Sequence, residues 1–200
     1  MSTYIAFLRA INVGGHTVRM EHLRTLFAEL GFARVETFIA SGNVIFEAPK
    51  EDARVLEERI ATHLRQALGY DVATFVRSPS QLAAVADCRP FSTGELDAPG
   101  ITLTIAFLSD APEAEAQRAL MAFRSTVNDF HVHGREIYWL CRTRTTQSGF
   151  SGALLERAVG MPATLRNANT VRKIAAQLQI PDGARAGGGN LASKTPGKET

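Results

Sequence analysis

The spacing of hydrophobic and polar positions changes several times along the first half of the chain. Residues 4–8 form a short, nearly continuous apolar run, which predicts a strand buried on both faces. Apolar side chains then recur at intervals of three and four over residues 20–30, as on one face of a helix, and Gly31 is placed to cap it. Residues 35–46 have the composition of a hairpin, with a Ser-Gly-Asn turn in the middle.

A second helix and a fourth strand complete this half of the chain. Leucine and isoleucine recur every four residues from Leu56 to Leu68, which predicts the helix. Residues 72–76 have strand composition, so the predicted order is β-α-β-β-α-β. A short helix that begins near Pro79 then leads to a loop rich in proline, glycine and serine over residues 90–100.

The second half repeats the same order, so we predict a first module over residues 1–89 and a second over residues 90–180. The predicted elements are a strand at 101–108, a helix at 112–123, hairpin strands at 130–133 and 137–140, a helix at 154–159, a strand at 163–166 and a helix at 170–178. Residues 181–200 contain five glycines, two prolines and one large apolar residue, which is typical of a flexible tail.

Two copies of this order define the expected fold class, which is α+β. We predict two tandem split-βαβ modules of the ferredoxin-like type, each with an antiparallel sheet covered on one face by helices and related by internal duplication. The adjacent strands of each hairpin argue against a doubly wound nucleotide-binding fold, in which strands and helices alternate throughout.

The composition is that of a globular protein, with 45% hydrophobic and 21% charged residues among 200. It excludes collagen-like, wholly disordered and disulfide-rich chains. Cys88 and Cys141 form no C-x-x-C pair, so we expect reduced thiols. No run of about eighteen apolar residues predicts a membrane span, and the first residues lack the cationic start of a signal peptide. We therefore expect a cytoplasmic protein of bacterial type.

Charge is distributed unevenly along the chain, although the formal net charge is only +2. Residues 1–130 carry 12 Lys and Arg against 16 Asp and Glu, a balance of −4, whereas residues 131–200 carry 10 against 4, a balance of +6. The basic part could attract an anion, a phosphate group or a polynucleotide. The alternative is a solvated face followed by a basic tail.

Two polar turns in the first half are candidate ligand sites. A glycine pair between a strand and a helix can present backbone N–H groups to an anion, although neither nucleotide-binding glycine motif is present. The hairpin turn offers a hydroxyl and an amide. Tight turns use the same residue types for purely structural reasons, so this alternative stays open. The candidates here are Arg9, Asn12, Gly14, Gly15, Ser41, Gly42 and Asn43.

The richest polar cluster comes late in the chain, in residues 142–148 and 166–173. These segments combine cations, hydroxyls and amides, and arginine binds phosphate in a bidentate manner. Helix capping accounts for one or two of these residues but not for all. His131 and His133 share a strand face, but zinc needs three or four ligands, so we predict no metal site. The candidates in the cluster are Arg144, Arg166, Asn167, Asn169 and Thr170.

Five short motifs together resemble a known family. They are Leu8-Arg9-Ala10-Ile11-Asn12-Val13-Gly14-Gly15, Ser41-Gly42-Asn43-Val44, His133-Gly134-Arg135-Glu136, Ala153-Leu154-Leu155-Glu156-Arg157 and Arg166-Asn167-Ala168-Asn169-Thr170-Val171. The chain is similar in this respect to domain-of-unknown-function family 1697, over about residues 3–179. The resemblance implies two linked α+β modules and no established activity, substrate or cofactor. By this resemblance the chain departs from the usual family pattern at three positions. Ala10 replaces a common glycine, Ala168 a common aromatic residue and Gly149 a frequent lysine.

The leading functional hypothesis is a binding protein for an anionic ligand, either a phosphate-bearing small molecule or a nucleic acid, near the basic second module. The alternative is an enzyme with its site between the modules, for which spacing identifies no carboxylate pair, triad, metal set or cofactor motif. A third class is an interaction protein, in which a sheet edge forms a homodimer. We expect no cofactor and no membrane partner, and either a monomer or a homodimer.

Overall fold

The computed structural model describes residues 1–13, 15–39 and 41–179, and the predicted tail at 181–200 lies outside them. The first module includes β1 (Ser2–Leu8), α1 (Met20–Glu29), β2 (Ala33–Thr37), β3 (Asn43–Ala48), α2 (Ala53–Leu68) and β4 (Thr74–Arg77). The helices α3 (Pro79–Asp87) and α4 (Thr93–Leu96) follow. The second module includes β5 (Thr102–Leu108), α5 (Ala114–Met121), β6 (Asn128–His133), β7 (Glu136–Cys141), the 3-10 turn η1 (Thr145–Gln147), α6 (Gly152–Val159), β8 (Ala163–Asn167) and α7 (Ala168–Gln179).

Each module has one four-stranded antiparallel sheet, which confirms the predicted α+β class. The strand order is β2-β3-β1-β4 in the first sheet and β6-β7-β5-β8 in the second, so the two modules are similar. Both orders are compatible with a ferredoxin-like fold, because the strand that follows the hairpin turn lies between the first two strands.

Local sequence signals begin and end several helices. The Asp52 carboxylate accepts the Arg54 N–H at 2.8 Å before α2, and Gly69 ends this helix in the left-handed conformation with φ 79°. Ser78 and Gln81 form a capping box before α3. The region predicted as loop contains the single turn α4, which a Ser-x-x-Glu capping box begins.

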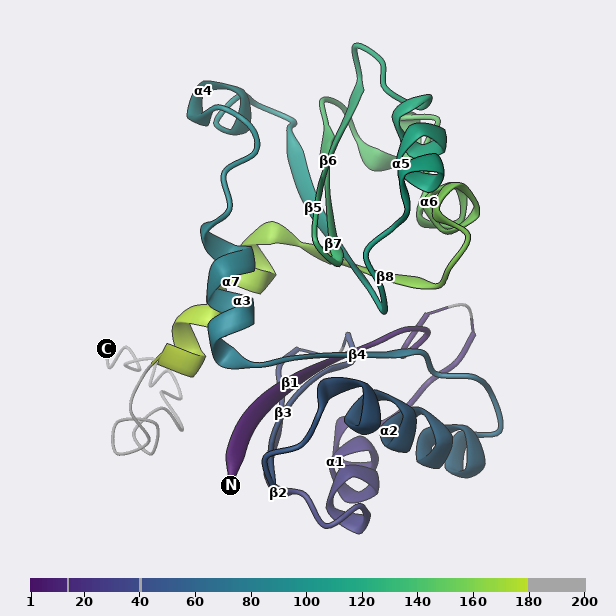
Figure 1. The fold of residues 1–200 in the computed structure, drawn as a ribbon, viewed down its shortest axis with the longest axis vertical. Helices are drawn as coiled ribbons and strands as arrows, with labels where there is room; N and C mark the ends of the chain where they lie inside the picture. The colour runs from purple at the N-terminus through teal and green to yellow at the C-terminus, as the bar shows by residue number, and fades with distance from the viewer. Residues whose placement is uncertain (14, 40, 180–200) are drawn as a thin grey trace, which may run out of the picture.

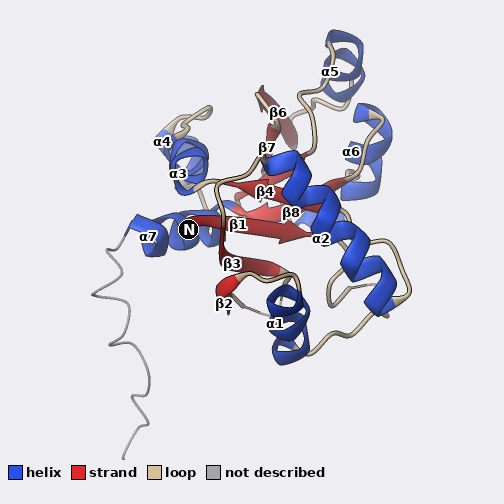
Figure 2. Ribbon diagram, turned by 60° about the horizontal axis from the view of Figure 1, so that its bottom comes forward, coloured by secondary structure: helices blue, strands red, loops and turns tan. Residues whose placement is uncertain are grey.

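Helices cover the outer face of each sheet, and the two inner faces turn toward each other (Figures 1 and 2). The pair α1 and α2 covers the first sheet, and the pair α5 and α6 covers the second. At one side, α3 and α7 lie against each other between the two modules (Figure 1). The prediction of helices on one face is therefore incomplete, because α3, α7 and the opposite sheet together cover the second face.

We call the region where the inner faces meet the seam. At its centre Phe7 of β1 stacks on Phe107 of β5, with ring centroids 4.0 Å apart and planes 13° apart. Both rings are fully buried. The Tyr138 hydroxyl crosses the seam and donates to the Val85 carbonyl at 3.0 Å, which satisfies its polar end inside the apolar cluster.

A helix that spans a bilayer needs about 20 consecutive, mostly apolar residues. None of the helices in residues 1–13, 15–39 and 41–179 combines the length and the hydropathy that a membrane span requires.

Candidate functional site at the seam

Two buried arginines occupy equivalent places in the two modules. Arg77 on β4 lies opposite Ile5 in the sheet register, and Arg166 on β8 lies opposite Ile105. Arg77 is 2% exposed and Arg166 is 8% exposed. Each arginine reaches into the other module, so the two form a reciprocal pair around the central rings.

Arg77 is bound by carboxylates as well as by the backbone. Its Nε donates to Glu136 Oε1 at 2.6 Å, and its Nη2 donates to the Leu108 carbonyl at 3.0 Å. The buried carboxylate of Glu57 lies 3.6 Å from its Nη1. Burial lowers the pKa of the Arg77 guanidinium, and Glu136 acts against this. Burial also raises the pKa of the Glu57 carboxyl, although the Val76 N–H and nearby arginines oppose the shift.

Arg166 repeats these contacts with neutral partners. Its Nε donates to Asn43 Oδ1 at 2.5 Å, where Asn43 stands at the register position equivalent to that of Glu136. Its Nη2 donates to the Leu8 carbonyl at 2.8 Å, as Arg77 does to Leu108. The remaining acceptors are Gly42 O, Thr164 Oγ1 and Leu165 O.

The charge of Arg166 is not compensated nearby. No carboxylate of the described residues forms an ion pair with it, although its five N–H groups have acceptors. Burial alone lowers the pKa of the Arg166 guanidinium to about 10, so it stays protonated at neutral pH. A buried cation without a counter-ion is costly, which makes this the most unusual electrostatic feature of the seam.

A pocket opens beside β8 on the Arg166 side of the seam, with a volume of about 370 Å³. The loop after β1, the first turn of α6 and the strand β8 form its walls. The lining residues are Arg9, Ala10, Val13, His16, Gly152, Ala153, Glu156, Ala163 and Leu165. Because Leu165 lines the pocket and its carbonyl accepts from Arg166, the buried cation lies directly behind this wall.

Arg9 and Glu156 join the modules at the pocket. Arg9 Nε and Nη2 donate to the two carboxylate oxygens of Glu156 at 2.6 and 2.9 Å. Burial acts to raise the pKa of the Glu156 carboxyl, but the bonds from Arg9 and the Ala163 N–H outweigh it, so the pKa lies below its usual value. The Arg9 side chain is 43% exposed, and no described residue accepts from its Nη1.

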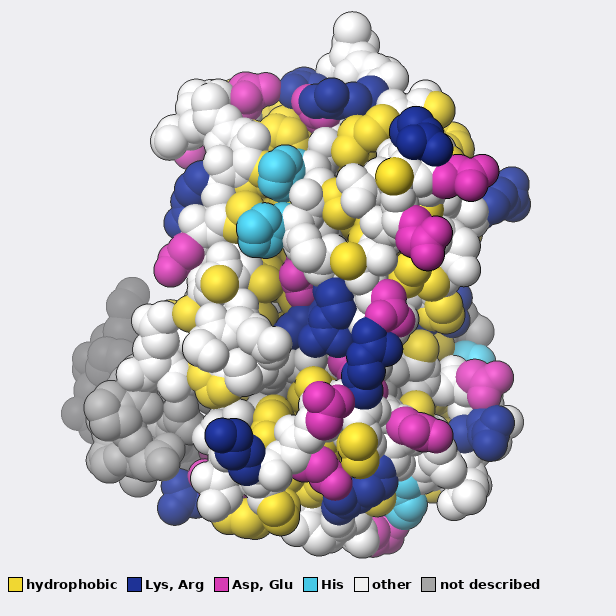
Figure 3. Space-filling model, viewed as in Figure 1, with side chains coloured by type: hydrophobic (Ala, Val, Ile, Leu, Met, Phe, Trp, Pro, Cys, Tyr) yellow, Lys and Arg dark blue, Asp and Glu magenta, His cyan; other side chains and the backbone are white. Residues whose placement is uncertain are grey.

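Ion pairs fill the equivalent position on the Arg77 side. Glu57 occupies the same place on α2 as Glu156 on α6, four residues after the helix begins. Arg54 forms a salt bridge with Asp110, and Arg135 lies 3.5 Å from Glu57. Figure 3 shows cationic and anionic side chains mixed at mid-height, at the level where the modules meet. We therefore call this the closed side, and the pocket side the open side.

The predicted glycine turn is a strained loop beside the pocket. Ala10 and Asn12 adopt positive φ values of 62° and 55°, and Gly15 one of 90°. Asn12 Oδ1 accepts the Val18 N–H at 2.7 Å, which holds the loop closed. Asparagine tolerates this conformation better than alanine does, so Ala10 is the strained residue.

Replacing Ala10 with glycine should therefore stabilise the protein. We expect Ala10→Gly to raise the free energy of unfolding by about 0.5 kcal/mol, since relief of left-handed strain slightly exceeds the entropic cost of glycine. Urea denaturation measures the change. The control, Ala61→Gly inside α2, should lower stability by about 1 kcal/mol. Equal losses in both variants would contradict strain at Ala10.

The predicted hairpin turn meets the second module. Gly42 has φ 70°, and a Cβ there would lie 3.0 Å from the Cβ of Ile11, so any other residue would be strained at this position. The Asn43 Nδ2 donates to Ser41 Oγ at 2.9 Å and to the Phe38 carbonyl at 3.0 Å. These bonds orient the Asn43 oxygen toward Arg166, and the turn therefore positions the seam.

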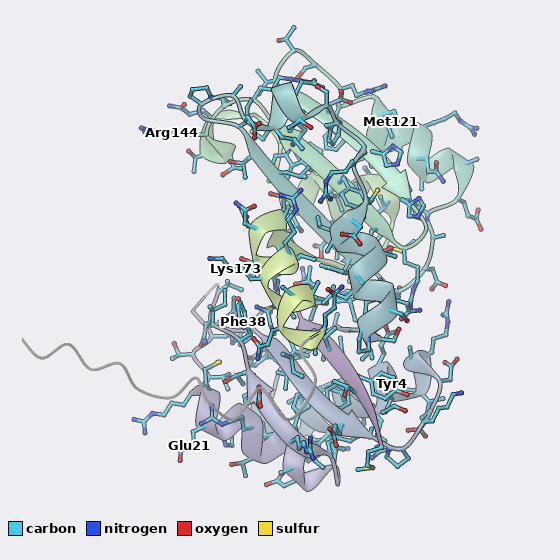
Figure 4. All side chains as sticks on the ribbon, turned by 90° about the vertical axis from the view of Figure 1, so that its left-hand side faces the viewer. Tyr4, Glu21, Phe38, Met121, Arg144 and Lys173 are labelled. Atoms are coloured by element: carbon cyan, nitrogen blue, oxygen red, sulfur yellow. The ribbon has the colours of Figure 1, made fainter. Side chains whose placement is uncertain are left out.

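The structure brings together only part of the predicted site. Arg9, Gly42, Asn43 and Arg166 gather at the seam, whereas Gly14 lies outside the described residues. Asn167, Asn169 and Thr170 lie at the exposed or half-buried start of α7, where Asn167 Oδ1 accepts the Asn169 N–H at 2.9 Å as a cap. Figure 4 places Arg144 near the far end of the second module, away from Phe38 and Lys173.

Sequence reasoning missed the partners of these residues. Arg77, Glu57 and Glu136 were not among the predicted site residues; all three are buried, and both carboxylates pair with Arg77. One signal was present, because the tetrapeptide Ile-Ala-Phe-Leu occurs both at 5–8 and at 105–108. Aligning the halves on it places Phe7 on Phe107, and the sheet registers then relate Arg77 to Arg166.

Two other kinds of site have no support in the described geometry. Phe46, Tyr138 and Trp139 lie on strands but are buried, so these rings offer no exposed surface on which bases could stack. His131 and His133 are exposed with ring centroids 6.5 Å apart. Within the part of the chain that the structure describes, no three His, Cys, Asp or Glu side chains are grouped to hold a metal ion.

Fold and seam together define a two-module α+β protein with one open and one closed inter-module side. The chain belongs to the family described as "Protein of unknown function (DUF1697)", which matches residues 1–138. This confirms the family resemblance, although the last two motifs lie beyond the matched range. The fold is similar to that of the conserved bacterial protein SP0830 from Streptococcus pneumoniae, with a TM-score of 0.69, 22% identity, and coverage of 90% of this chain and 99% of that one. No curated protein sequence matches the chain.

Proposed function

We propose that the protein binds a small anionic ligand in the pocket on the open side of the seam. The observation that carries this proposal is the buried Arg166, whose charge no described carboxylate balances and which lies behind the pocket wall. On the closed side, Glu136 and Glu57 balance the equivalent Arg77. An anion in the pocket would supply on the open side the negative charge that these carboxylates supply on the closed side.

Groups around the pocket can receive such an anion. Arg9 presents its Nη1 while its other nitrogens hold Glu156. The first turn of α6 lines the pocket, and the Ser151 cap takes the N–H of Leu154. The N–H groups of Gly152 and Ala153 can then donate to an anion, which the helix dipole also favours. Ala10 and Leu165 offer apolar contact to the rest of the ligand.

Arginine replacement on the two sides of the seam tests this proposal. We expect wild-type protein to bind benzoate or phenyl phosphate in isothermal titration calorimetry, and Arg9→Gln to weaken binding by about tenfold or more, since a charged hydrogen bond is lost. The matched control is Arg54→Gln, which removes an inter-module ion pair on the closed side. Its affinity should equal that of the wild type.

Two outcomes would contradict a ligand site on the open side. One is that neither probe binds to wild-type protein at millimolar concentration. The other is that Arg9→Gln and Arg54→Gln bind equally well. Binding of single-stranded oligonucleotide with a steep salt dependence, and with no effect of Arg9→Gln, would instead favour a nucleic-acid surface elsewhere on the second module.

The proposal also covers internal duplication, cellular location and oligomeric state. Equivalent residues at Phe7 and Phe107, and at Arg77 and Arg166, support internal duplication with a division near residue 89. A cytoplasmic location in a bacterium, and a monomeric or homodimeric state, stay predictions from the sequence.

A further inference from the structure

The two sides of the seam differ by one unit of charge. On the closed side three cations face three carboxylates, which makes that side neutral. These groups are Arg54, Arg77 and Arg135 with Glu57, Asp110 and Glu136. On the open side Arg9 and Arg166 face Glu156 alone, so one positive charge is in excess.

We propose that the pocket selects ligands with a single negative charge, of the carboxylate class, over doubly charged phosphate monoesters. This inference rests on the proposed function. One negative charge neutralises the open side, whereas two leave an excess of negative charge beside the Glu156 carboxylate, whose side chain is 21% exposed. The closed side shows the same balance achieved within the chain, because the Glu136 carboxylate stands where the open side has the amide of Asn43.

Because Asn43 is neutral, it does not compensate the positive charge of Arg166. It is fully buried, and its oxygen lies 2.5 Å from Arg166 Nε. Asn43 does not line the pocket, so changing it alters the charge balance without removing a ligand contact. A carboxylate at this position would compensate Arg166 from within and remove the reason to bind an anion.

A pair of probes with the same ring tests the charge rule on unmodified protein. Benzoate carries one negative charge at about pH 8, and phenyl phosphate carries two, because its second ionisation has a pKa of about 6. We expect calorimetry to give benzoate an affinity higher by about tenfold or more. Equal affinity, or tighter binding of phenyl phosphate, would overturn the selection of single charges.

A substitution in the protein, with the ligand kept the same, tests the same charge rule. We expect Asn43→Asp to weaken benzoate binding by about tenfold or more. The matched control is Asn128→Asp, since Asn128 is also buried, accepts from the Trp139 indole and donates to the Ser148 carbonyl, but lies in the outer core of the second module. Its benzoate affinity should match that of the wild type. Circular dichroism tests whether both variants fold. If Asn43→Asp does not fold, the comparison of benzoate with phenyl phosphate on wild-type protein tests the charge rule instead.

These results separate the two proposals. If neither probe binds to wild-type protein, the ligand site itself is wrong. If both probes bind and Arg9→Gln weakens both, but phenyl phosphate binds at least as well or folded Asn43→Asp keeps its affinity, then the ligand site stands and the charge rule is wrong.

Discussion

Phe107→Ala is expected to lower the free energy of unfolding by about 4 kcal/mol, the range typical of a large ring removed from a tightly packed core. Phe107 is fully buried and stacks on Phe7 at the centre of the seam. The guanidinium of Arg77 lies over the same ring, 5.5 Å from its centroid. The substitution therefore removes apolar contact and leaves a cavity beside a buried cation. Urea denaturation followed by circular dichroism measures the loss.

Phe123→Ala is the matched control for this ring deletion. Phe123 is 37% exposed and contacts Phe150 at the edge of the outer core of the second module. Because burial is partial, we expect a loss of only about 1 kcal/mol. Similar losses for the two variants would show that the stacked rings at the seam contribute no more than a surface ring.

Arg77→Met is expected to destabilise the protein by about 3–5 kcal/mol, because the change leaves buried carboxylates without their cation. Glu136 and Glu57 are 7% and 8% exposed, and Arg77 lies against both. Methionine fills a similar volume but cannot compensate their charge. The loss should become smaller as the pH falls, since burial raises the pKa of the Glu57 carboxyl and its protonated form no longer needs a cation. Denaturation at about pH 8 and about pH 5 measures both effects.

Arg166→Met provides the comparison, because it leaves only neutral hydrogen-bond acceptors without a donor. Asn43 Oδ1 and the Leu8 carbonyl lose a donor, but no carboxylate does. We therefore expect a smaller loss of about 1–3 kcal/mol, with little dependence on pH. If Arg166→Met is as costly as Arg77→Met and follows the same pH profile, then the two sides of the seam do not differ in charge as described.

The order of elements could be predicted because each element carries its own local signal. The apolar run that became β1 and the four-residue repeat of α2 both lie in the predicted places. The single turn α4 escaped prediction because it is too short for a hydrophobic period, although its capping pair Ser92 and Glu95 is visible in the sequence. No local sequence signal predicts that both faces of each sheet are covered, because this depends on how the modules dock.

The site was predictable only where its residues lie in recognisable turns. The turns at Arg9 and at Gly42 could be identified from composition, and their neighbours Leu8 and Asn43 accept hydrogen bonds from Arg166. Side chains alternate along β8, so Arg166 enters the seam while Asn167 next to it is exposed and caps α7. Arg77 belongs to no motif and Glu136 lies 59 residues away in another one, so only the docked structure reveals their pairing.

The stacking of the inner sheet faces also bears on how the chain can be divided. Each half has a core of its own under its outer helices, but the rings of Phe7 and Phe107 and the cations Arg77 and Arg166 on the inner faces are each sheltered by the opposite half. A chain truncated after α3 would leave a broad apolar sheet surface in contact with water. We therefore expect the two halves to unfold together, in spite of their separate sheets.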